Sequence, residues 1–326
     1  MKKIFVALAA VATMVACSKD EMVQQYQEAI GFGNAFVGNS TRADAAADPS
    51  YSASVKPLTQ FNVWGAINDK EDGFLPVFAG ESVSGTVGAN SVWNCTKTQY
   101  WVEDAVYNFA GLVNAGTVTL GNDKLPATVD FEVSTGKGTV DLLYALSDTY
   151  TGEASNNPLV KMDFNHLLSK VMFTVNNTST AATEYSFLVK NITINGATAG
   201  TCALPAMTWT PTTSGNFTEF SQIPVAGGVA KQVCASELLL IPGEVNVSFT
   251  IDIIYGSKTI ASHNYATTAA QTLKVGHAYN FVINVSVGQP IQFTVASYPT
   301  WENGNTTPTD APDHIVLPVA EVTTGA

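Results

Sequence analysis

A run of alternating side chains in the second half of the chain reads Val245-Asn246-Val247-Ser248-Phe249-Thr250-Ile251-Asp252-Ile253-Ile254-Tyr255. Every second residue from Val245 to Tyr255 is apolar, and the residues between them are mostly polar. Because the side chains of a strand point alternately to its two faces, this run predicts a half-buried β-strand with one apolar face.

Shorter runs of the same kind recur along the chain, and Gly, Asn and Pro separate them. They are 61–67, 106–112, 128–133, 140–145, 159–164, 169–177, 185–194, 237–241 and 277–287. No amphipathic helical pattern longer than about two turns accompanies them. Many short alternating runs between turn residues predict an all-β fold of the sandwich type.

The length of 326 residues predicts two domains. A polar loop at 176–182 places the boundary between them close to Asn177. The expected division is a signal segment at 1–16, an N-terminal arm at 17–50, a first β-sandwich at 51–177, a second at 178–301 and a tail at 302–326.

The composition excludes some classes of partner. Charged residues make up only 13% of the chain, and 15 Lys and Arg stand against 27 Asp and Glu, for a net charge of −12. Such a chain has no electrostatic reason to bind nucleic acid or an anionic membrane face.

The N-terminus has the form of an export signal. A basic head, Met1-Lys2-Lys3, precedes an apolar segment at 4–16 that is shorter than the about 20 residues of a membrane-spanning helix. Met14-Val15-Ala16-Cys17 resembles a bacterial lipobox, in which the thiol of Cys17 is acylated, and two acyl chains anchor a protein stably. Ser18-Lys19-Asp20-Glu21 resembles the acidic signal that sends such lipoproteins to the cell surface. An ordinary signal peptide is the alternative interpretation.

The N-terminal arm combines a short strand with a cleavable linker. The residues 29–37 form a strand-like run in which Ile30, Phe32 and Phe36 are the apolar members. Arg42 is the only arginine of the chain, and it lies in the small, polar stretch 38–50. An arginine in such a segment is open to a trypsin-like protease, which would cut between Arg42 and Ala43. The alternative is a solvated linker residue.

The search for catalytic and metal-binding motifs is negative. The sequence contains no GxSxG, HExxH, P-loop or dinucleotide-binding motif and no CxxC, and its four histidines lie far apart. The sequence therefore predicts no enzymatic activity, no cofactor and no metal site. Beside Cys17, the cysteines Cys95, Cys202 and Cys234 allow at most one disulfide, and Cys202–Cys234 is conceivable although no spacing supports it.

Two further sets of residues favour structural roles. A lone histidine beside apolar residues, such as His166, is usually a hydrogen-bonded structural residue. The aromatic residues that occur singly within strand-like runs favour core packing over sugar stacking; they are Trp64, Trp93, Tyr100, Trp101, Tyr107, Trp209 and Trp301.

The order of these landmarks resembles the fimbrillin family of the Bacteroidetes, the subunits of type V pili. The landmarks are Cys17, 30–32, 41–43, 61–65, 100–101, 107–110, 141–145, 160–175, 276–281, 290–293 and Trp301. The block Val160-Lys161-Met162-Asp163-Phe164-Asn165-His166-Leu167-Leu168-Ser169-Lys170-Val171-Met172-Phe173-Thr174-Val175 is the most specific of them.

The resemblance implies two transthyretin-like β-sandwich domains in tandem and a structural, non-enzymatic role. It also implies an assembly route: export as an outer-membrane lipoprotein, cleavage after Arg42, and loss of the strand that contains Ile30, Phe32 and Phe36. A strand of another pilus subunit would then enter the vacated groove by β-augmentation. The expected location is a fimbria on the cell surface, where it supports adhesion.

The tail offers a donor strand. A polar, Pro-containing spacer at 302–312 precedes an apolar, β-prone run at 314–324. Its candidate inserting side chains are Ile315, Leu317, Val319 and Val322. Pro318 cannot donate to a strand ladder and would have to face the open side. The alternative for this tail is a final strand of the subunit's own sandwich.

A second hypothesis for the whole chain keeps the lipid anchor but not the assembly. In it the protein is an uncleaved surface lipoprotein or tip adhesin that binds a host glycan or a host protein.

Overall fold

The computed structural model describes residues 28–37, 58–69, 73–86, 93–135, 140–179, 185–218, 220, 222–227, 229–232, 238–298 and 313–322. Within these ranges the regular structure consists of strands in three sheets, with no helix. No helix that could cross a membrane occurs in the described part of the chain. The prediction of an all-β fold is thereby confirmed.

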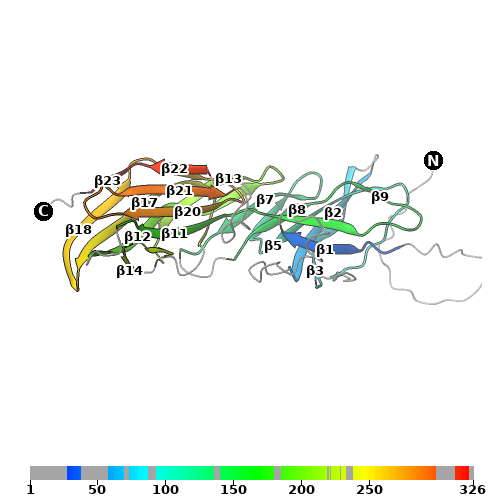
Figure 1. Ribbon diagram of the computed structural model, residues 1–326. Coiled ribbons are helices and arrows are strands. Elements are labelled where there is room, and N and C mark those ends of the chain that lie inside the picture. Colours follow the sequence, from blue (N-terminus) through cyan, green and yellow to red (C-terminus); the bar gives the residue numbers. More distant parts are fainter. Residues whose placement is uncertain are drawn as a thin grey trace, which may run out of the picture.

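An 8-stranded sheet forms one half of the elongated molecule (Figure 1). Its strands, in spatial order, are β1 (Phe32–Val37), β10 (Val160–His166), β8 (Leu143–Leu146), β5 (Val106–Val113), β2 (Gln60–Asp69), β3 (Gly73–Ser84) and β4 (Asn94–Cys95), and β9 (Tyr150–Thr151) pairs with β5.

This sheet curls until its two ends meet. Phe32 of β1 forms an isolated antiparallel bridge with Trp93, just before β4, and Ala29 forms another with Tyr100. The strand β1 therefore lies between β10 on one side and the segment 93–101 on the other.

Two further sheets form the other half. The 6-stranded sheet has the order β15 (Val229–Gln232), β11 (Ser169–Asn177), β20 (Ala278–Val285), β21 (Gln292–Tyr298) and β22 (Asp313–Leu317), and β16 (Leu238–Leu240) pairs with β11. The 9-stranded sheet has the order β23 (Val319–Glu321), β18 (Lys258–Thr267), β17 (Gly243–Tyr255), β12 (Tyr185–Ala203), β7 (Pro126–Glu132) and β6 (Thr117–Leu120). In the same sheet β13 (Thr208–Phe217) and β14 (Ile223–Ala226) pair with β12, and β19 (Gln271–Leu273) pairs with β17.

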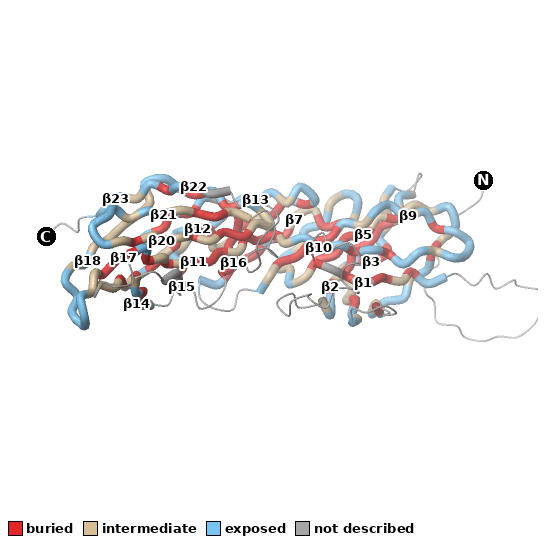
Figure 2. Tube along the Cα trace, in the orientation of Figure 1, coloured by how far each residue is buried: buried red, intermediate tan, exposed pale blue. Residues whose placement is uncertain are grey.

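The buried residues fall into two apolar clusters, which follow the strand interiors in Figure 2. One cluster fills the curled 8-stranded sheet and includes Phe32, Phe61 and Phe109. The other lies between the 6- and 9-stranded sheets, where the Phe249 and Phe293 ring centroids are 5.5 Å apart. The outer face of the curled sheet joins this second cluster, so both halves share an apolar junction.

The alternating run 245–255 forms most of β17, as predicted. Val245, Val247, Phe249 and Ile251 are buried on its inner face. Ile253 is half-buried and Tyr255 is exposed, because the strand runs past the end of the core.

The change of sheet does not coincide with the predicted boundary near Asn177. The chain leaves the 8-stranded sheet after β5, returns to it at β8, and leaves it for the last time between β10 and β11, at Leu167 and Leu168, both fully buried. Asn177 ends β11 inside the second half, where its buried Nδ2 donates to the carbonyl of Val225. The polar stretch 176–182 thus begins at the end of a strand, and the last change of sheet before it is apolar. The division into domains itself stays a prediction.

A buried carboxylate on β17 stabilises the 9-stranded sheet. Asp252 is 4% exposed, and it accepts hydrogen bonds from Lys190 Nζ at 2.5 Å and from Ser262 Oγ at 2.6 Å. Burial alone would raise the pKa of Asp252, but these two hydrogen bonds and the charge of Lys190 outweigh it and lower the pKa.

We expect Asp252→Ala to reduce the free energy of unfolding at pH 7 by about 1–3 kcal/mol, because it leaves the Lys190 ammonium without its partner. A pKa lowered by folding stabilises the protein above the unfolded value of about 3.9, and that contribution is lost as the pH falls through the folded value. Urea unfolding measured from pH 7 to pH 3 should therefore show the gap to the wild type closing at low pH. The exposed Asp163 is the control position, and an equal loss in Asp163→Ala would contradict the assignment.

Candidate functional site

The segment 28–37, which ends in β1, is paired on both of its sides. On one edge it runs parallel to β10, and Val160 N donates to Gly31 O at 2.9 Å. On the other edge Ile30 N donates to Gln99 O at 2.8 Å, and Trp101 N donates to Glu28 O at 2.9 Å. We call the place that this strand occupies, between β10 and 93–101, the β1 groove.

The floor of the β1 groove is aromatic. Phe32 is 1% exposed, and its ring centroid lies 5.9 Å from that of Phe61, 5.7 Å from that of Phe78 and 6.1 Å from that of Phe109. Aromatic pairs at these separations add to the free energy gained by burial alone. Phe32 is thus the central anchor of β1.

A register shift divides β1 in two. Phe32 pairs with Val160 and Ala35 with Met162, so β1 advances three residues while β10 advances two. The buried positions are therefore Ile30, Phe32, Ala35 and Val37, rather than a strictly alternating set.

A polar contact fixes the start of β1. One carboxylate oxygen of Glu28, Oε2, accepts from the backbone N of Asn157 at 2.7 Å and from Asn157 Nδ2 at 3.1 Å. This contact, together with the apolar anchors, sets the position of the strand along the groove.

The sequence-predicted residues of the removable strand have the following places. Ile30 and Phe32 are buried in the β1 groove. The backbone of Phe36 pairs with Asp163 of β10. Sequence reasoning missed Ala35 and Val37, because it assumed no bulge; Gly33-Asn34 was the available signal, since Gly within a strand often marks one. Cys17, Arg42 and Ala43 lie outside the described residues.

The candidate donor residues lie in the second half of their own subunit. β22 pairs antiparallel with β21, and β23 pairs antiparallel with β18, so each is an edge strand of its sheet. Leu317 is buried, whereas Ile315 is 39% and Val322 46% exposed and Val319 is half-buried. Pro318 lies between the two strands, and its carbonyl accepts from Thr268 N at 2.9 Å. In this monomer the tail is a final part of its own sandwich, the alternative that the sequence left open.

His166 is hydrogen-bonded, as expected. Its Nδ1 lies 2.6 Å from Asp141 Oδ2. Burial raises the pKa of Asp141, and the contact with His166 opposes that rise. The pair sits at the crossing between the halves, where Leu167 N donates to Leu142 O.

The predicted core role holds for most of the aromatic residues that the structure describes. Trp64, Trp93, Trp101 and Tyr107 are buried, whereas Tyr100 is 49% exposed. Trp209 is half-buried, and its Nε1 donates to Leu167 O at 2.8 Å. Trp301 lies outside the described residues.

The thiols described are unpaired with one another. Cys95 and Cys202 are both free, and Cys234 lies outside the described residues. Burial raises the pKa of the Cys202 thiol to about 12, which makes it unreactive at neutral pH.

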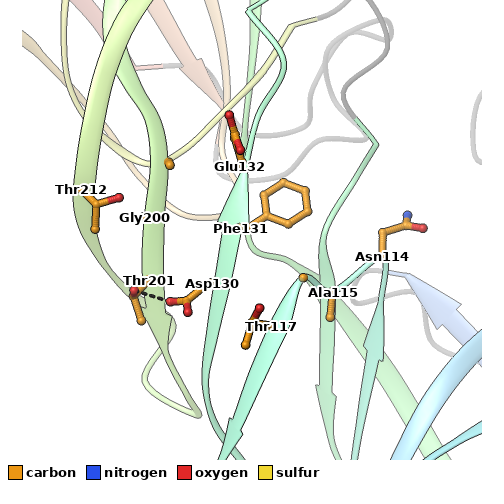
Figure 3. Close-up of a pocket in the computed structure, with 11 residues that line it drawn as sticks. Asn114, Ala115, Thr117, Asp130, Phe131, Glu132, Gly200, Thr201 and Thr212 are labelled. Carbon is orange, nitrogen blue, oxygen red and sulfur yellow. Dashed lines mark hydrogen bonds between the residues drawn. The ribbon is translucent and has the colours of Figure 1, made fainter.

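A hollow with both polar and apolar lining residues opens beside β6 and β7 (Figure 3). It has a volume of about 640 Å³ and is lined by Asn114, Ala115, Gly116, Thr117, Asp130, Phe131, Glu132, Ala199, Gly200, Thr201 and Thr212. Asp130 and Thr201 are paired residues of the neighbouring strands β7 and β12, and Thr201 Oγ1 donates to Asp130 Oδ1 at 2.5 Å. Among the described residues no group of three or more Cys, His, Asp or Glu could hold a metal ion. The hollow therefore offers open, solvated polar groups, whereas the β1 groove is built for a peptide strand.

Comparisons with known proteins bear on the family and the fold of the chain. A family model described as fimbrillin-like matches residues 51–299, which excludes β1 and the tail. A crystal structure of a fimbrial protein from Bacteroides vulgatus is 16% identical with a TM-score of 0.58, covering 83% of this chain and 98% of that one. This likeness shows the fold. The fimbrial anchor protein Mfa2 from Porphyromonas gingivalis is 12% identical with a TM-score of 0.37, covering 82% of this chain and 97% of that one. No curated protein sequence matches the chain.

We expect Phe32→Ala to reduce the free energy of unfolding by about 3–5 kcal/mol, because it empties the aromatic floor of the β1 groove. The measurement is urea unfolding of the unacylated protein, monitored by tryptophan fluorescence. Tyr100→Ala, at an exposed aromatic residue near the same strand, should change stability by about 0.5 kcal/mol or less. Equal effects of the two variants would mean that Phe32 does not anchor β1.

Proposed function

The chain belongs to the fimbrillin-like family, and from that premise we propose that it is a structural pilus subunit whose β1 is exchanged for a strand of another subunit. The observation that carries this proposal is that the segment 28–37, which ends in β1, is paired with other parts of the chain on both of its sides. The strand fills a gap between β10 and 93–101, yet it continues into the rest of the chain only through the residues between β1 and β2.

The single arginine lies in that connection. β1 ends at Val37, β2 begins at Gln60, and Arg42 stands between them. A cut after Arg42 leaves β1 joined to the N-terminal arm and to nothing else by covalent bonds. The arm, with β1 and an acylated Cys17, can then leave the subunit, which is released from its anchor by the same cut.

Loss of β1 creates a strong acceptor. The donors Val160 N and Trp101 N and the acceptor Gln99 O lose their partners, and the aromatic floor of the groove meets water. Unpaired backbone groups beside an apolar groove are a template for an added strand. Refilling restores both the hydrogen bonds and the burial.

The positions of acceptor and tail favour an open polymer. β1 lies in one half of the molecule, and β22 and β23 lie in the other (Figure 1). Two different surfaces meet in such a contact, so a growing polymer always keeps a free groove at one end and a free tail at the other. Head-to-tail contacts of this kind build fibres. Export as an outer-membrane lipoprotein, and a final place in a surface fimbria that supports adhesion, belong to the same proposal. A non-enzymatic role fits the family and this design.

An arginine-specific protease tests the cut, since the chain contains one arginine. We expect a single cleavage after Arg42 in the unacylated protein, seen by mass spectrometry, followed by fibres in electron micrographs. Arg42→Lys keeps the positive charge but removes the only site for this protease, so it should stay intact and monomeric.

Two results would contradict the proposal. One is fibre formation by uncleaved Arg42→Lys to the wild-type extent. The other is complete cleavage that leaves a stable monomer, which would favour an accessory, tip or free-standing lipoprotein that binds a host glycan or a host protein.

A further inference from the structure

A pocket opens at one end of the second half, where the 9-stranded sheet extends past the core. β17 continues to Tyr255 and β18 begins at Lys258, whereas β20 ends at Val285. The turn 286–291, which joins β20 to β21, lines the pocket opposite these strands. We call this hollow the end pocket, and it has a volume of about 350 Å³. β18 marks this end of the molecule in Figure 1.

The floor of the end pocket is part of the apolar core. Phe187, Ile251 and Val285 line the pocket and are buried in the cluster between the two sheets. The walls are half-buried apolar residues that pack against the same cluster: Ile253, Tyr265 and Ile291. A ligand in this pocket would therefore extend the packing of the core.

The turn that forms the other wall is held in place by hydrogen bonds. Val287 N donates to Ser179 Oγ at 2.9 Å, and Thr178 N donates to Val285 O at 2.9 Å. Gly288 has a φ of +70°, a left-handed conformation that glycine adopts without strain. The pocket is thus already formed in the free protein, and a ligand would not have to order the turn.

The chemistry of the lining disfavours a charged ligand. Among the described residues that line the end pocket, none is Asp, Glu, Lys or Arg. An ion that left water for these apolar walls would lose its hydration without gaining a counter-charge. The ligand is therefore uncharged.

His263 in the lining supplies a hydrogen-bond acceptor. Its Nδ1 lies 2.8 Å from Glu321 Oε1, and a carboxylate only accepts hydrogen bonds. In the neutral ring the proton therefore lies on Nδ1, and Nε2 is left as an acceptor. A hydroxyl or N–H group of a ligand can donate to it.

The volume and the aromatic side chains indicate the size and shape of the ligand. An apolar protein cavity of about 150 Å³ admits benzene, and the end pocket has more than twice that volume. Tyr185 and Tyr265 in its lining offer ring faces for stacking. We propose that the end pocket binds an uncharged two-ring aromatic molecule that carries one hydroxyl or N–H donor.

The exposed part of the pocket suits a small molecule better than a protein. Of the lining residues, only Ile260 and Val287 are exposed large hydrophobic side chains. A stable protein interface uses about 20–30 residues on each side. The two exposed side chains are thus the mouth of a small-molecule site.

Titration of the intact, unacylated protein with 2-naphthol at pH 7.5 tests the site. In NMR spectra of protein labelled at isoleucine methyl groups, we expect shifts at Ile251, Ile253, Ile260 and Ile291, and none at Ile30 and Ile67 in the first half. Naphthalene, which lacks the donor, should bind about fivefold more weakly. The charged analogues 2-naphthoate and 2-naphthylmethylamine should bind at least about tenfold more weakly.

Two variants test the pocket and its acceptor separately. Ile253→Trp places an indole in the pocket, so it should weaken binding of 2-naphthol by about tenfold or more and raise the urea midpoint, because it fills empty apolar space. Leu120→Trp, at an exposed leucine of β6, is the control and should change neither. His263→Phe keeps an aromatic ring but removes the acceptor, so it should bind 2-naphthol and naphthalene equally.

The results that would overturn the proposal are distinct. Absence of binding up to the solubility limit of 2-naphthol, or binding that shifts no isoleucine of the end pocket, would overturn the site. Equal or tighter binding of a charged analogue would overturn the class of ligand, and a His263→Phe variant that still prefers 2-naphthol would overturn the acceptor. The wild-type titrations decide the proposal even if Ile253→Trp fails to fold. None of these measurements uses cut protein or fibres, so their outcome is independent of strand exchange.

Discussion

The paired edges of β1 are the constraint on which the rest of the first half depends. The strands from β10 to β4 curl so far that only a gap between β10 and 93–101 remains, and the segment 28–37 closes it, with bonds to Val160, Gln99 and Trp101. Backbone groups beside an apolar core must find partners or be solvated at a cost. Any process that removes β1 therefore exposes two edges and an aromatic floor together, and only another strand can satisfy both.

In the monomer the β1 groove is filled and the tail is paired within its own subunit. β1 occupies the groove, and the tail lies along the edges of two sheets in the second half. Long, unprotected edges invite uncontrolled pairing between chains. A subunit that carries its own temporary strand can be exported without aggregating, and a covalent cut between β1 and β2 then decides when assembly begins.

The positions of many strands follow from the sequence, because the period of two survives wherever one face is buried. The run 245–255 became β17, and 169–177 became β11 without change of bounds. Ala35 and Val37 could not be foreseen, since a single extra residue at a bulge reverses the inward set. The last crossing between the halves was also hidden, because Leu167 and Leu168 form a buried apolar link, whereas the sequence analysis looked for the boundary in the polar loop 176–182.

Amide hydrogen exchange at Val160 and Trp101 tests the central claim most directly, because each donates its N–H to the residues that lead into β1, Gly31 and Glu28. Strand exchange predicts slow exchange at both amides in the intact protein, fast exchange in the protease-cut subunit after the arm has been removed, and slow exchange again in the fibre. Protection that persists in the cut subunit without its arm, or that fails to return in the fibre, would contradict it.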